Sequence, residues 1–422
     1  MAISATLGEV DSTSSRRSAV RARVRASGAV GLICAATLSV LAQASPSANQ
    51  LKSFGPDACA PADPAYIHTA NETGGIPMFL RRSEAAKAFH LVRESTRNNV
   101  ATATWATGVL DGKTQTIEIP VDSVTRRATF TFSVNTTGSK LVLRRPSGEV
   151  ISEGSATEIT ELNCGLIVTA ISPEAGNWRA EITGRGTFWM SAQVQSDIYF
   201  ISAEFVKEGG RPGHKGLFRI QGQPLVGMPA TLQASLSAAQ TRTTEFHLVN
   251  EHGEPIQRLH MQQVNSDHEM LEFVGSLDLP RVPFRVAVMG RDSQGKQYQR
   301  FFAPLFHAES VEVSPKVDFD ELPAGSARQA TFTVRSIGSP RTFRITVTDA
   351  RQFVSKVEPK ELSLGAGESG VVRVDLTVPG GTTPGVGDDV VVVVTSTAGP
   401  GTSNSSVVHF SVSLSSAVQN PR

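Results

Sequence analysis

The apolar and polar positions of the chain follow two periods, one typical of helices and one typical of strands. Residues 63–96 contain the helical patterns. "PAYIHTANETGG" has a proline near its start and a glycine pair at its end, which are helix start and stop signals. "SEAAKAFHLVRES" begins with Ser83, a residue type that caps helices. Between the two, the run "IPMFL" predicts a short buried strand.

The second predicted helix should have one buried face. Its apolar residues recur at helical spacing, and they are Ala86, Phe89, Leu91 and Val92. We therefore expect these side chains to face a protein core. The short strand before this helix has no predicted neighbour, so its edges would be exposed. We expect the whole segment either to pack on the following β-sandwich or to be partly disordered.

After residue 99 the period changes to two. Segments such as "ATFTFSV", "TEFHLVN" and "QATFTVRSIG" alternate in polarity, and Gly- and Pro-containing turns separate them. Strands at intervals of about 8–12 residues are typical of β-sandwiches. The pattern predicts three sandwiches, over residues 99–204, 205–311 and 312–414. In the third, the five valines Val390–Val394 predict a central strand buried on both faces.

The N-terminus has the pattern of a secretion signal. Arginines between Arg16 and Arg25 precede the apolar run Ala29–Ala42, and Ala42-Gln43-Ala44 fits the small-x-small cleavage rule. We predict a signal peptide over residues 1–44, cleavage near Ala44, and a secreted or cell-envelope protein. The apolar run is shorter than the roughly 20 residues of a membrane span, and no later run is longer, so we expect no integral membrane span. Residues 415–422 are predicted to be a disordered tail.

Composition and charge exclude one class of partner. The chain has 422 residues, of which 40% are hydrophobic and 19% charged, which is globular composition. Its 40 basic and 39 acidic residues give a net charge of +1. Nucleic-acid-binding domains usually carry a basic patch or a strongly basic balance. We therefore expect no nucleic-acid partner.

The cysteines leave two interpretations open. Cys34 lies in the predicted signal, so Cys59 and Cys164 remain in the mature chain. They could form one disulfide in an oxidising compartment. Because they lie in different predicted domains, we favour unpaired cysteines.

Several segments resemble those of known families. "TGGIPMF" and the helix after it are similar to the end of a von Willebrand factor A domain. "EIPVDSVTRRATFTFSV", "LVLRRPSGEVI" and "ISPEAGNWRAEITGRGTF" resemble the β region that follows this domain in hemicentin-like extracellular proteins. "VEPKELSLGAGESGVVRVDLTVP" resembles bacterial-type Ig-like modules. The resemblance implies a mainly β fold of tandem Ig-like or jelly-roll β-sandwiches. Residues 45–98 would precede them as a short α/β remnant of an A domain.

The A-domain family binds a divalent cation through an Asp-x-Ser-x-Ser loop at the end of a buried strand. The chain has one such run, Asp11-Ser12-Thr13-Ser14-Ser15. It precedes the apolar run of the signal and follows no buried strand, so it lacks the context that the motif requires. We assign no metal-binding residue and no cofactor, and we carry no metal-dependent adhesion over to this chain.

Other candidate residues have simpler interpretations. His247, His252, His260 and His268 are close in sequence, and we expect them on the surface rather than around a metal. Asp318, Asp320 and Glu321 lack the glycine and the spacing of a calcium loop, which favours a solvated turn. We expect Trp178 to fill the core of the first sandwich; an alternative for Trp178 or Trp189 is stacking on carbohydrate.

These observations predict a non-enzymatic adhesion or interaction scaffold. No catalytic motif of a hydrolase, kinase or metalloprotease occurs, so no catalytic residue is assigned. The alternative is the accessory β-domain portion of a secreted, protease-like hydrolase whose catalytic domain is missing or encoded upstream. The protein or surface ligand and the oligomeric state are not predicted.

Overall fold

The fold is built almost entirely from strands, as the period-two pattern predicts. The computed structural model describes residue 59 and residues 63–210, 215–237, 241–266, 270–398 and 401–414. The predicted signal peptide, the Asp11–Ser15 run, His268 and the predicted tail lie outside these residues. The described strands form five sheets, so the predicted mainly β fold class is confirmed.

The first sandwich encloses an apolar core between two sheets. Five strands of a nine-stranded sheet, in the order β1-β8-β3-β6-β5, face the three-stranded sheet β2-β7-β4. The bounds are β1 (Val100–Asp111), β2 (Gln115–Val121), β3 (Arg127–Val134), β4 (Lys140–Arg144), β5 (Thr157–Leu162), β6 (Gly165–Ile171), β7 (Gly176–Thr183) and β8 (Arg185–Gln195). Side chains alternate between the faces of a strand, so each strand contributes every second residue to this core.

The second sandwich uses the other four strands of the same nine-stranded sheet. These strands, in the order β13-β12-β16-β17, face the five-stranded sheet β10-β9-β11-β15-β14. The bounds are β9 (Tyr199–Gly209), β10 (Gly216–Arg219), β11 (Ala230–Ser237), β12 (Thr241–Asn250), β13 (Pro255–Leu259), β14 (Gln262–Ser266), β15 (Leu271–Leu277), β16 (Phe284–Asp292) and β17 (Gln297–Phe301). The boundary predicted between residues 204 and 205 falls inside β9.

A shared sheet and a buried ion pair join the first two sandwiches. Strand β17 pairs with β1, with Phe301 opposite Thr102. Close to this seam, the carboxylate of Asp122 accepts a hydrogen bond from Arg300, and both side chains are fully buried. A buried ion pair of this kind resists separation, because breaking it would leave an uncompensated charge. The two sandwiches therefore form one continuous structure.

The third sandwich has its own core. A four-stranded sheet, β18-β20-β24-β22, faces a five-stranded sheet, β19-β26-β25-β21-β23. The bounds are β18 (Val311–Lys316), β19 (Glu321–Pro323), β20 (Ala327–Ser336), β21 (Arg341–Thr348), β22 (Val354–Glu358), β23 (Glu361–Leu364), β24 (Ser369–Thr377), β25 (Gly387–Ser396) and β26 (Ser403–Ser413). Val390–Val394 lie in β25, the middle strand of its sheet, as expected. On the outer face of that strand, Val391 is buried and Val393 is half-buried.

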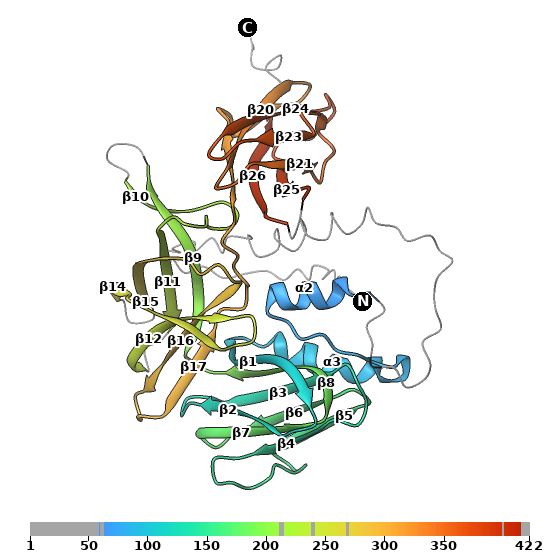
Figure 1. Ribbon diagram of the computed structural model, residues 1–422, viewed down its shortest axis with the longest axis vertical. Coiled ribbons are helices and arrows are strands. Elements are labelled where there is room, and N and C mark those ends of the chain that lie inside the picture. Colours follow the sequence, from blue (N-terminus) through green and yellow to red (C-terminus); the bar gives the residue numbers. More distant parts are fainter. Residues whose placement is uncertain are drawn as a thin grey trace, which may run out of the picture. The chain divides into compact units, whose positions relative to one another are not determined.

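The N-terminal described segment contains the two predicted helices, α2 (Ala65–Thr73) and α3 (Ala85–Ser95), with a 3-10 turn at Arg82–Glu84 before α3. Figure 1 shows both helices beside the strands of the first sandwich. Helix α2 ends at Gly74, whose φ of 72° is left-handed. A Cβ atom at Gly74 would lie 2.4 Å from the Ala303 carbonyl oxygen. Only glycine fits where the helix meets this backbone.

The prediction of a strand at "IPMFL" is wrong. Residues 75–80 contain no strand. Pro77 has no N–H to donate to a neighbouring strand, and the segment instead packs by its side chains. Phe79 is 7% exposed and lies edge-on to Trp189, with 5.6 Å between ring centroids. The segment therefore packs on the first sandwich, which was one of the two expected outcomes.

The cysteine prediction is also wrong. Cys59 and Cys164 form a disulfide, with 5.7 Å between their Cα atoms. Both lie in a small apolar cluster with Phe79, Trp105 and Trp189, on the face of the nine-stranded sheet outside the sandwich cores. The bond joins the chain just before α2 to the start of β6. Two segments assigned to different domains from the sequence are thus neighbours in space.

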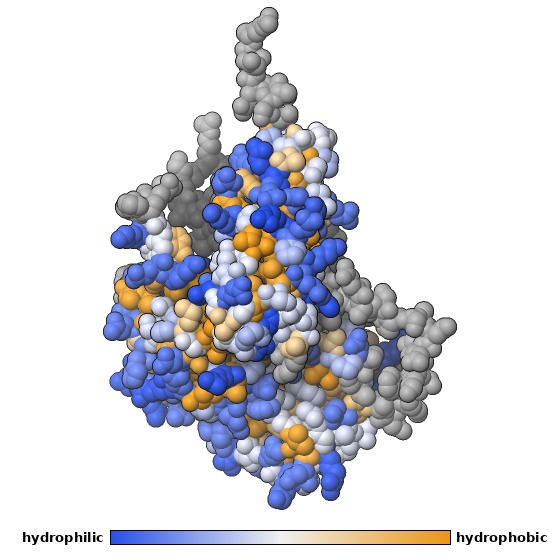
Figure 2. All heavy atoms as spheres, turned by 45° about the horizontal axis from the view of Figure 1, so that its top comes forward, coloured by the Kyte–Doolittle hydropathy of each residue, from blue (hydrophilic) through white to orange (hydrophobic). Residues whose placement is uncertain are grey.

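Neither helix among the described residues is long and apolar enough to span a bilayer. Figure 2 shows that apolar residues reach the viewed face in small groups among hydrophilic ones.

Candidate functional site

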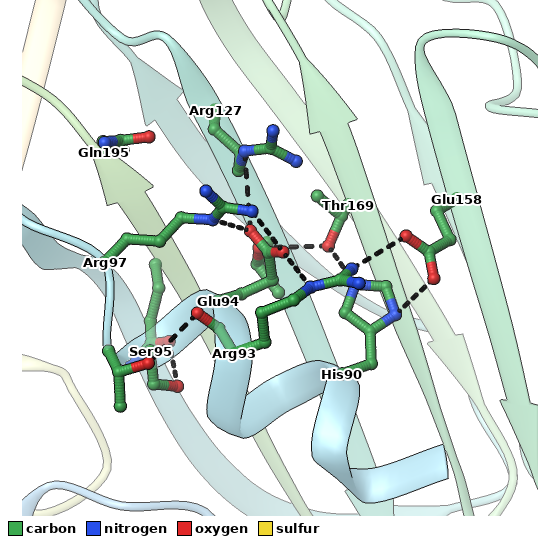
Figure 3. Close-up of polar contacts among 12 residues, drawn as sticks. His90, Arg93, Glu94, Ser95, Arg97, Arg127, Glu158, Thr169 and Gln195 are labelled. Carbon is green, nitrogen blue, oxygen red and sulfur yellow. Dashed lines mark hydrogen bonds and ion pairs between the residues drawn. The ribbon is translucent and has the colours of Figure 1, made fainter. Parts of the chain in front are cut away.

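Helix α3 lies on the first sandwich with its polar side inward. His90 is 8% exposed and Glu94 is 2% exposed, whereas Phe89 and Val92 are 57% and 55% exposed. Figure 3 shows the side chains of His90 and Glu94 directed from the helix towards the strands. The apolar face predicted to be buried is therefore directed outward, and that prediction is wrong.

The reason lies in the strands beneath the helix. In β3, Ala128, Phe130 and Phe132 belong to the apolar core of the sandwich. Because side chains alternate along a strand, Arg127 and Thr129 lie on the opposite face. A helix that covers this polar face gains hydrogen bonds only if its own polar residues point inward. The polarity of the sheet face, rather than that of the helix, decides which side of α3 is buried.

A carboxylate surrounded by three arginines is the centre of the contact. Arg97 donates to both carboxylate oxygens of Glu94, at 2.7 and 3.1 Å, and Arg93 donates to one of them at 3.0 Å. Nε of Arg127, on β3, lies 3.5 Å from Glu94 Oε2. Arg93 lies in α3 and Arg97 just after it, so the contact with Arg127 joins the C-terminal half of the helix to the sheet.

The same contacts determine the charge of Glu94. Burial acts to raise the pKa of Glu94, but hydrogen bonds from Arg97 and Arg93 and the charge of Arg127 outweigh burial, so the pKa is lowered. A carboxylate in this position remains ionised at neutral pH and cannot serve as a general acid there. Its role is that of an anchor.

His90 connects a carboxylate to a buried hydroxyl. Its Nδ1 lies 2.8 Å from Glu158 Oε1 and its Nε2 lies 3.0 Å from Thr169 Oγ1. If Nδ1 donates to the carboxylate, Nε2 is the acceptor and Thr169 donates to it. Carboxylate, imidazole and hydroxyl thus follow one another in the order found in nucleophilic hydrolases.

The surroundings do not suit catalysis. Thr169 is 1% exposed, lies in the middle of β6, and is 3.1 Å from the hydroxyl of Thr129. A substrate carbonyl would have to come within about 3–3.5 Å of the hydroxyl oxygen to react, and α3 and the sheet occupy that space. The network satisfies buried polar groups and fixes the N-terminal half of the helix, as Glu94 fixes the other half.

Beside the outward face of α3 lies an open hollow of about 600 Å³. Its lining includes Ala86, Phe89 and Val92 from the helix and Glu158 and Thr160 from β5. Lys87 and Arg93 also line it. Both glutamates between residues 82 and 95, Glu84 and Glu94, are buried, so the outward side of α3 exposes apolar and basic groups. This combination suits contact with another molecule better than it suits solvent.

The other residues considered from the sequence do not come together. His247, His252 and His260 lie on or beside β12 and β13, and His252 and His260 are exposed. Asp318, Asp320 and Glu321 are all exposed, between β18 and the start of β19. In the described part of the chain, no group of three or more His, Cys, Asp or Glu side chains could hold a metal ion.

The tryptophans are core residues. Trp178 is fully buried, stacks on Phe130 with 5.0 Å between centroids, and donates its indole N–H to the Glu174 carbonyl oxygen at 2.8 Å. Trp189 is 4% exposed. Neither ring offers a face to a sugar, so Trp178 fills the core as expected and the carbohydrate alternative has no support.

The sequence analysis assigned no role to Glu94, Arg97, Arg127 or His90. The sequence does contain a pattern that could have identified these residues. Polar residues recur at helical spacing on the side of α3 opposite Phe89 and Val92, and strand alternation puts Arg127 on the non-core face of β3. The sequence could not show which face of the helix is buried, because that depends on the polarity of the sheet face on which the helix lies.

Comparisons with known proteins add one similarity at the level of sequence. Residues 316–415 match the model of the VWA7 Ig-like domain. This segment covers most of the third sandwich. No curated protein sequence matches the chain significantly.

Similarities to solved structures are weak. A Bacillus licheniformis lipase in propeptide form is 9% identical with a TM-score of 0.23; the match covers 48% of this chain and 43% of the lipase. Elastase-activated alpha-2-macroglobulin from Escherichia coli is 10% identical with a TM-score of 0.25, over 74% of this chain and 33% of the macroglobulin. The ICAM-5 D1–D4 ectodomain fragment is 10% identical with a TM-score of 0.19, over 73% and 76% of the two chains. At these TM-scores none of the three informs the fold or the function of this chain.

Proposed function

We propose that this chain is an extracellular, non-enzymatic interaction scaffold. The observation that carries the proposal is the joining of helices and sandwiches into one frame. A nine-stranded sheet runs through two sandwiches, and the helical segment is fixed to it by the contact of Glu94 with Arg127 and by the Cys59–Cys164 disulfide. A frame held by buried polar contacts keeps surface loops and helix faces in fixed positions, which is what a binding scaffold requires.

The disulfide supports an extracellular location. Disulfides persist in oxidising compartments and are rare in the cytosol. A signal peptide over residues 1–44 would direct the chain to such a compartment. The similarity of residues 316–415 to the VWA7 Ig-like domain agrees with this location. It also supports the proposal that residues 45–98 derive from an A-type domain.

The binding face would be the outward side of α3. Phe89 and Val92 are the exposed apolar groups, Lys87 and Arg93 are the cations beside them, and the hollow next to β5 offers a recess for a side chain of the partner. Aromatic residues and arginine are enriched at the centres of protein interfaces. Arg93 is already paired with Glu94 and Glu158, and Lys87 donates to the Glu161 carbonyl oxygen, so a protein ligand with apolar side chains fits this surface.

Attachment of cells to surfaces coated with the secreted full chain tests the proposal. We expect attachment to the wild-type protein, and a loss of at least about tenfold for the double variant F89S/V92S. Each deleted anchor at an interface centre costs on the order of 1–2 kcal/mol. The control is V109S, because Val109 is 67% exposed on β1 away from the helix. Equal attachment to both variants would place binding elsewhere, and no attachment to the wild type would contradict the scaffold.

A hydrolase assay tests for an activity of the chain itself. The Glu158–His90–Thr169 order is the arrangement closest to a catalytic site that we identified in the described chain. This assay tests whether the chain is itself an enzyme, and we expect no turnover of p-nitrophenyl acetate or casein above a buffer blank. Turnover that disappears in the variant T169V would establish an enzyme and overturn the non-enzymatic proposal.

A further inference from the structure

Three asparagines of the chain begin the pattern Asn-x-Ser/Thr, which accepts N-linked oligosaccharides in secreted proteins. They are Asn71, Asn135 and Asn404, and all three lie among the described residues. The reaction replaces one of the two N–H bonds of the side-chain nitrogen Nδ2 by a bond to C1 of the sugar. A site that is compatible with the folded chain therefore needs an Nδ2 that reaches solvent and does not use both N–H groups inside the protein.

Asn135 meets both conditions. It follows β3 in the turn that leads to β4, and its Oδ1 accepts a hydrogen bond from the Thr187 N–H at 2.8 Å. Gly186 permits this approach, because a Cβ atom there would lie 2.5 Å from Oδ1. With Oδ1 held against the end of β8, Nδ2 lies on the other side of the carboxamide. It donates to no described residue, and the protein does not enclose it.

The turn that carries Asn135 leaves room for a sugar. Thr137, which supplies the hydroxyl of the pattern, and Gly138 after it are both exposed. A Cβ atom at Gly138 would meet no atom within 4 Å. Val134 belongs to the core of the first sandwich, and side chains alternate along a strand. Asn135 is therefore directed away from that core, at the surface end of β3.

Asn404 meets neither condition. It is 5% exposed. Its Nδ2 donates to the carbonyl oxygens of Gln223 and Val311, at 3.1 and 2.9 Å, and its Oδ1 accepts from the Gln223 N–H at 2.8 Å. A sugar on Nδ2 would remove one of these donors and leave a buried carbonyl group without a partner, which is costly. A chain modified at Asn404 could not keep these contacts.

Asn71 is part of an internal contact. It lies in α2, its carbonyl oxygen accepts a hydrogen bond from the buried Arg285, and its Oδ1 is enclosed by the protein. Thr73, which supplies the hydroxyl of this pattern, donates to the Thr69 carbonyl oxygen at 2.7 Å. A sugar on this carboxamide would compete for the space between α2 and the second sandwich. Asn71 is therefore a poor site in the folded chain.

We propose that Asn135 is the N-glycosylation site of the folded chain and that Asn71 and Asn404 stay unmodified. The donor is an oligosaccharide joined to a lipid pyrophosphate. Nδ2 of Asn135 forms a bond to C1 of the sugar, the bond between C1 and the phosphate oxygen breaks, the lipid pyrophosphate leaves, and Nδ2 loses one proton. The proposal rests on the secretory route proposed above, and it is independent of the binding face on α3.

Expression of the full chain in cultured mammalian cells tests the proposal. We expect peptide-N-glycosidase F to lower the apparent mass of the secreted protein in one step. In ¹⁸O-labelled water this enzyme converts a modified asparagine into labelled aspartate, so mass spectrometry of peptides identifies the residue. The label should be found at position 135 and be absent from positions 71 and 404. A label at either of the other two positions, or no label, would overturn the proposal.

Two substitutions of Thr137 provide a matched pair. T137A removes the hydroxyl that the pattern requires and T137S retains it, and both leave Asn135 in place at an exposed turn. We expect T137A to lose the modification and T137S to keep it; equal modification of both would contradict the proposal. Unmodified wild-type chain in the medium would refute the site but not the secreted location, whereas unmodified chain retained inside the cells would contradict both.

Discussion

The guanidinium group of Arg285 lies over the indole ring of Trp105, with its central carbon 4.2 Å from the ring centroid. Arg285 belongs to the second sandwich and Trp105 to the first. The same guanidinium donates to the Ala303 carbonyl oxygen at 3.0 Å and to the Asn71 carbonyl oxygen at the end of α2. One buried cation therefore joins both sandwiches and a helix.

Replacing this cation should weaken the frame. In R285M the cation–π contact is lost and two carbonyl groups lose their donor, so we expect a loss of about 2–4 kcal/mol in the free energy of unfolding. Guanidinium chloride unfolding of the full chain measures it. The control is R291M on the same strand, because Arg291 is exposed. A loss of the same size in both variants would show that the contacts of Arg285 do not stabilise the fold beyond what an exposed arginine contributes.

The charge of Glu94 should hold α3 in place. E94Q keeps the shape of the side chain but removes the charge that three arginines share, and we expect a loss of about 2 kcal/mol, less than for a fully enclosed pair. The arginine partners are only partly buried. Hydrogen exchange of the α3 peptide would rise more than that of β3. E161Q, at an exposed carboxylate on β5, should change the exchange much less.

The contact between α2 and the second sandwich should depend on pH. His307 Nε2 lies 2.8 Å from Glu72 Oε2, and this hydrogen bond raises the pKa of His307 above its ordinary value of 6.5. The contribution is complete below pH 6.5 and is lost as the pH rises through the raised pKa. Hydrogen exchange of α2, corrected for the intrinsic rate, should therefore increase in mildly alkaline solution. H307Q should abolish this increase, whereas H68Q should retain it because His68 is mostly exposed.

The disulfide should contribute substantially to stability. Cys59 and Cys164 are separated by 105 residues, and closing a loop of this length restricts the unfolded chain by up to about 5 kcal/mol. We expect C164S to lose about 2–5 kcal/mol. Peptide mapping without reductant should recover residues 59 and 164 in one linked fragment. Two free thiols in the native secreted protein would contradict the structure.

Much of the fold was predictable from local pattern. Alternation in "ATFTFSV" became β3, and the glycine pair after Thr73 ended α2, because the two faces of a strand and the end of a helix depend on residues close in sequence. The valine run became the middle strand of its sheet for the same reason. Trp178 was recognisable as a core residue from its type and its place in a strand.

The candidate site was not predictable in the same way. The spacing of Phe89 and Val92 was identified correctly as one face of a helix, but that face is exposed. The partner surface is the polar side of β3 and β6, contributed by residues 30 or more positions away in sequence. The pairing of Cys59 with Cys164 also depends on two distant segments that meet on one sheet face.

The sequence by itself determined the class of fold, the two helices and the composition of each strand face, because these depend on periods of two and 3.6 residues. Only the tertiary structure decided that one sheet runs through two sandwiches, that α3 is buried by its charged side, and that Cys59 meets Cys164. The physical reason is that burial of a polar group is tolerated only where a partner compensates it. Such partners come from segments far apart along the chain, which local pattern does not relate to one another.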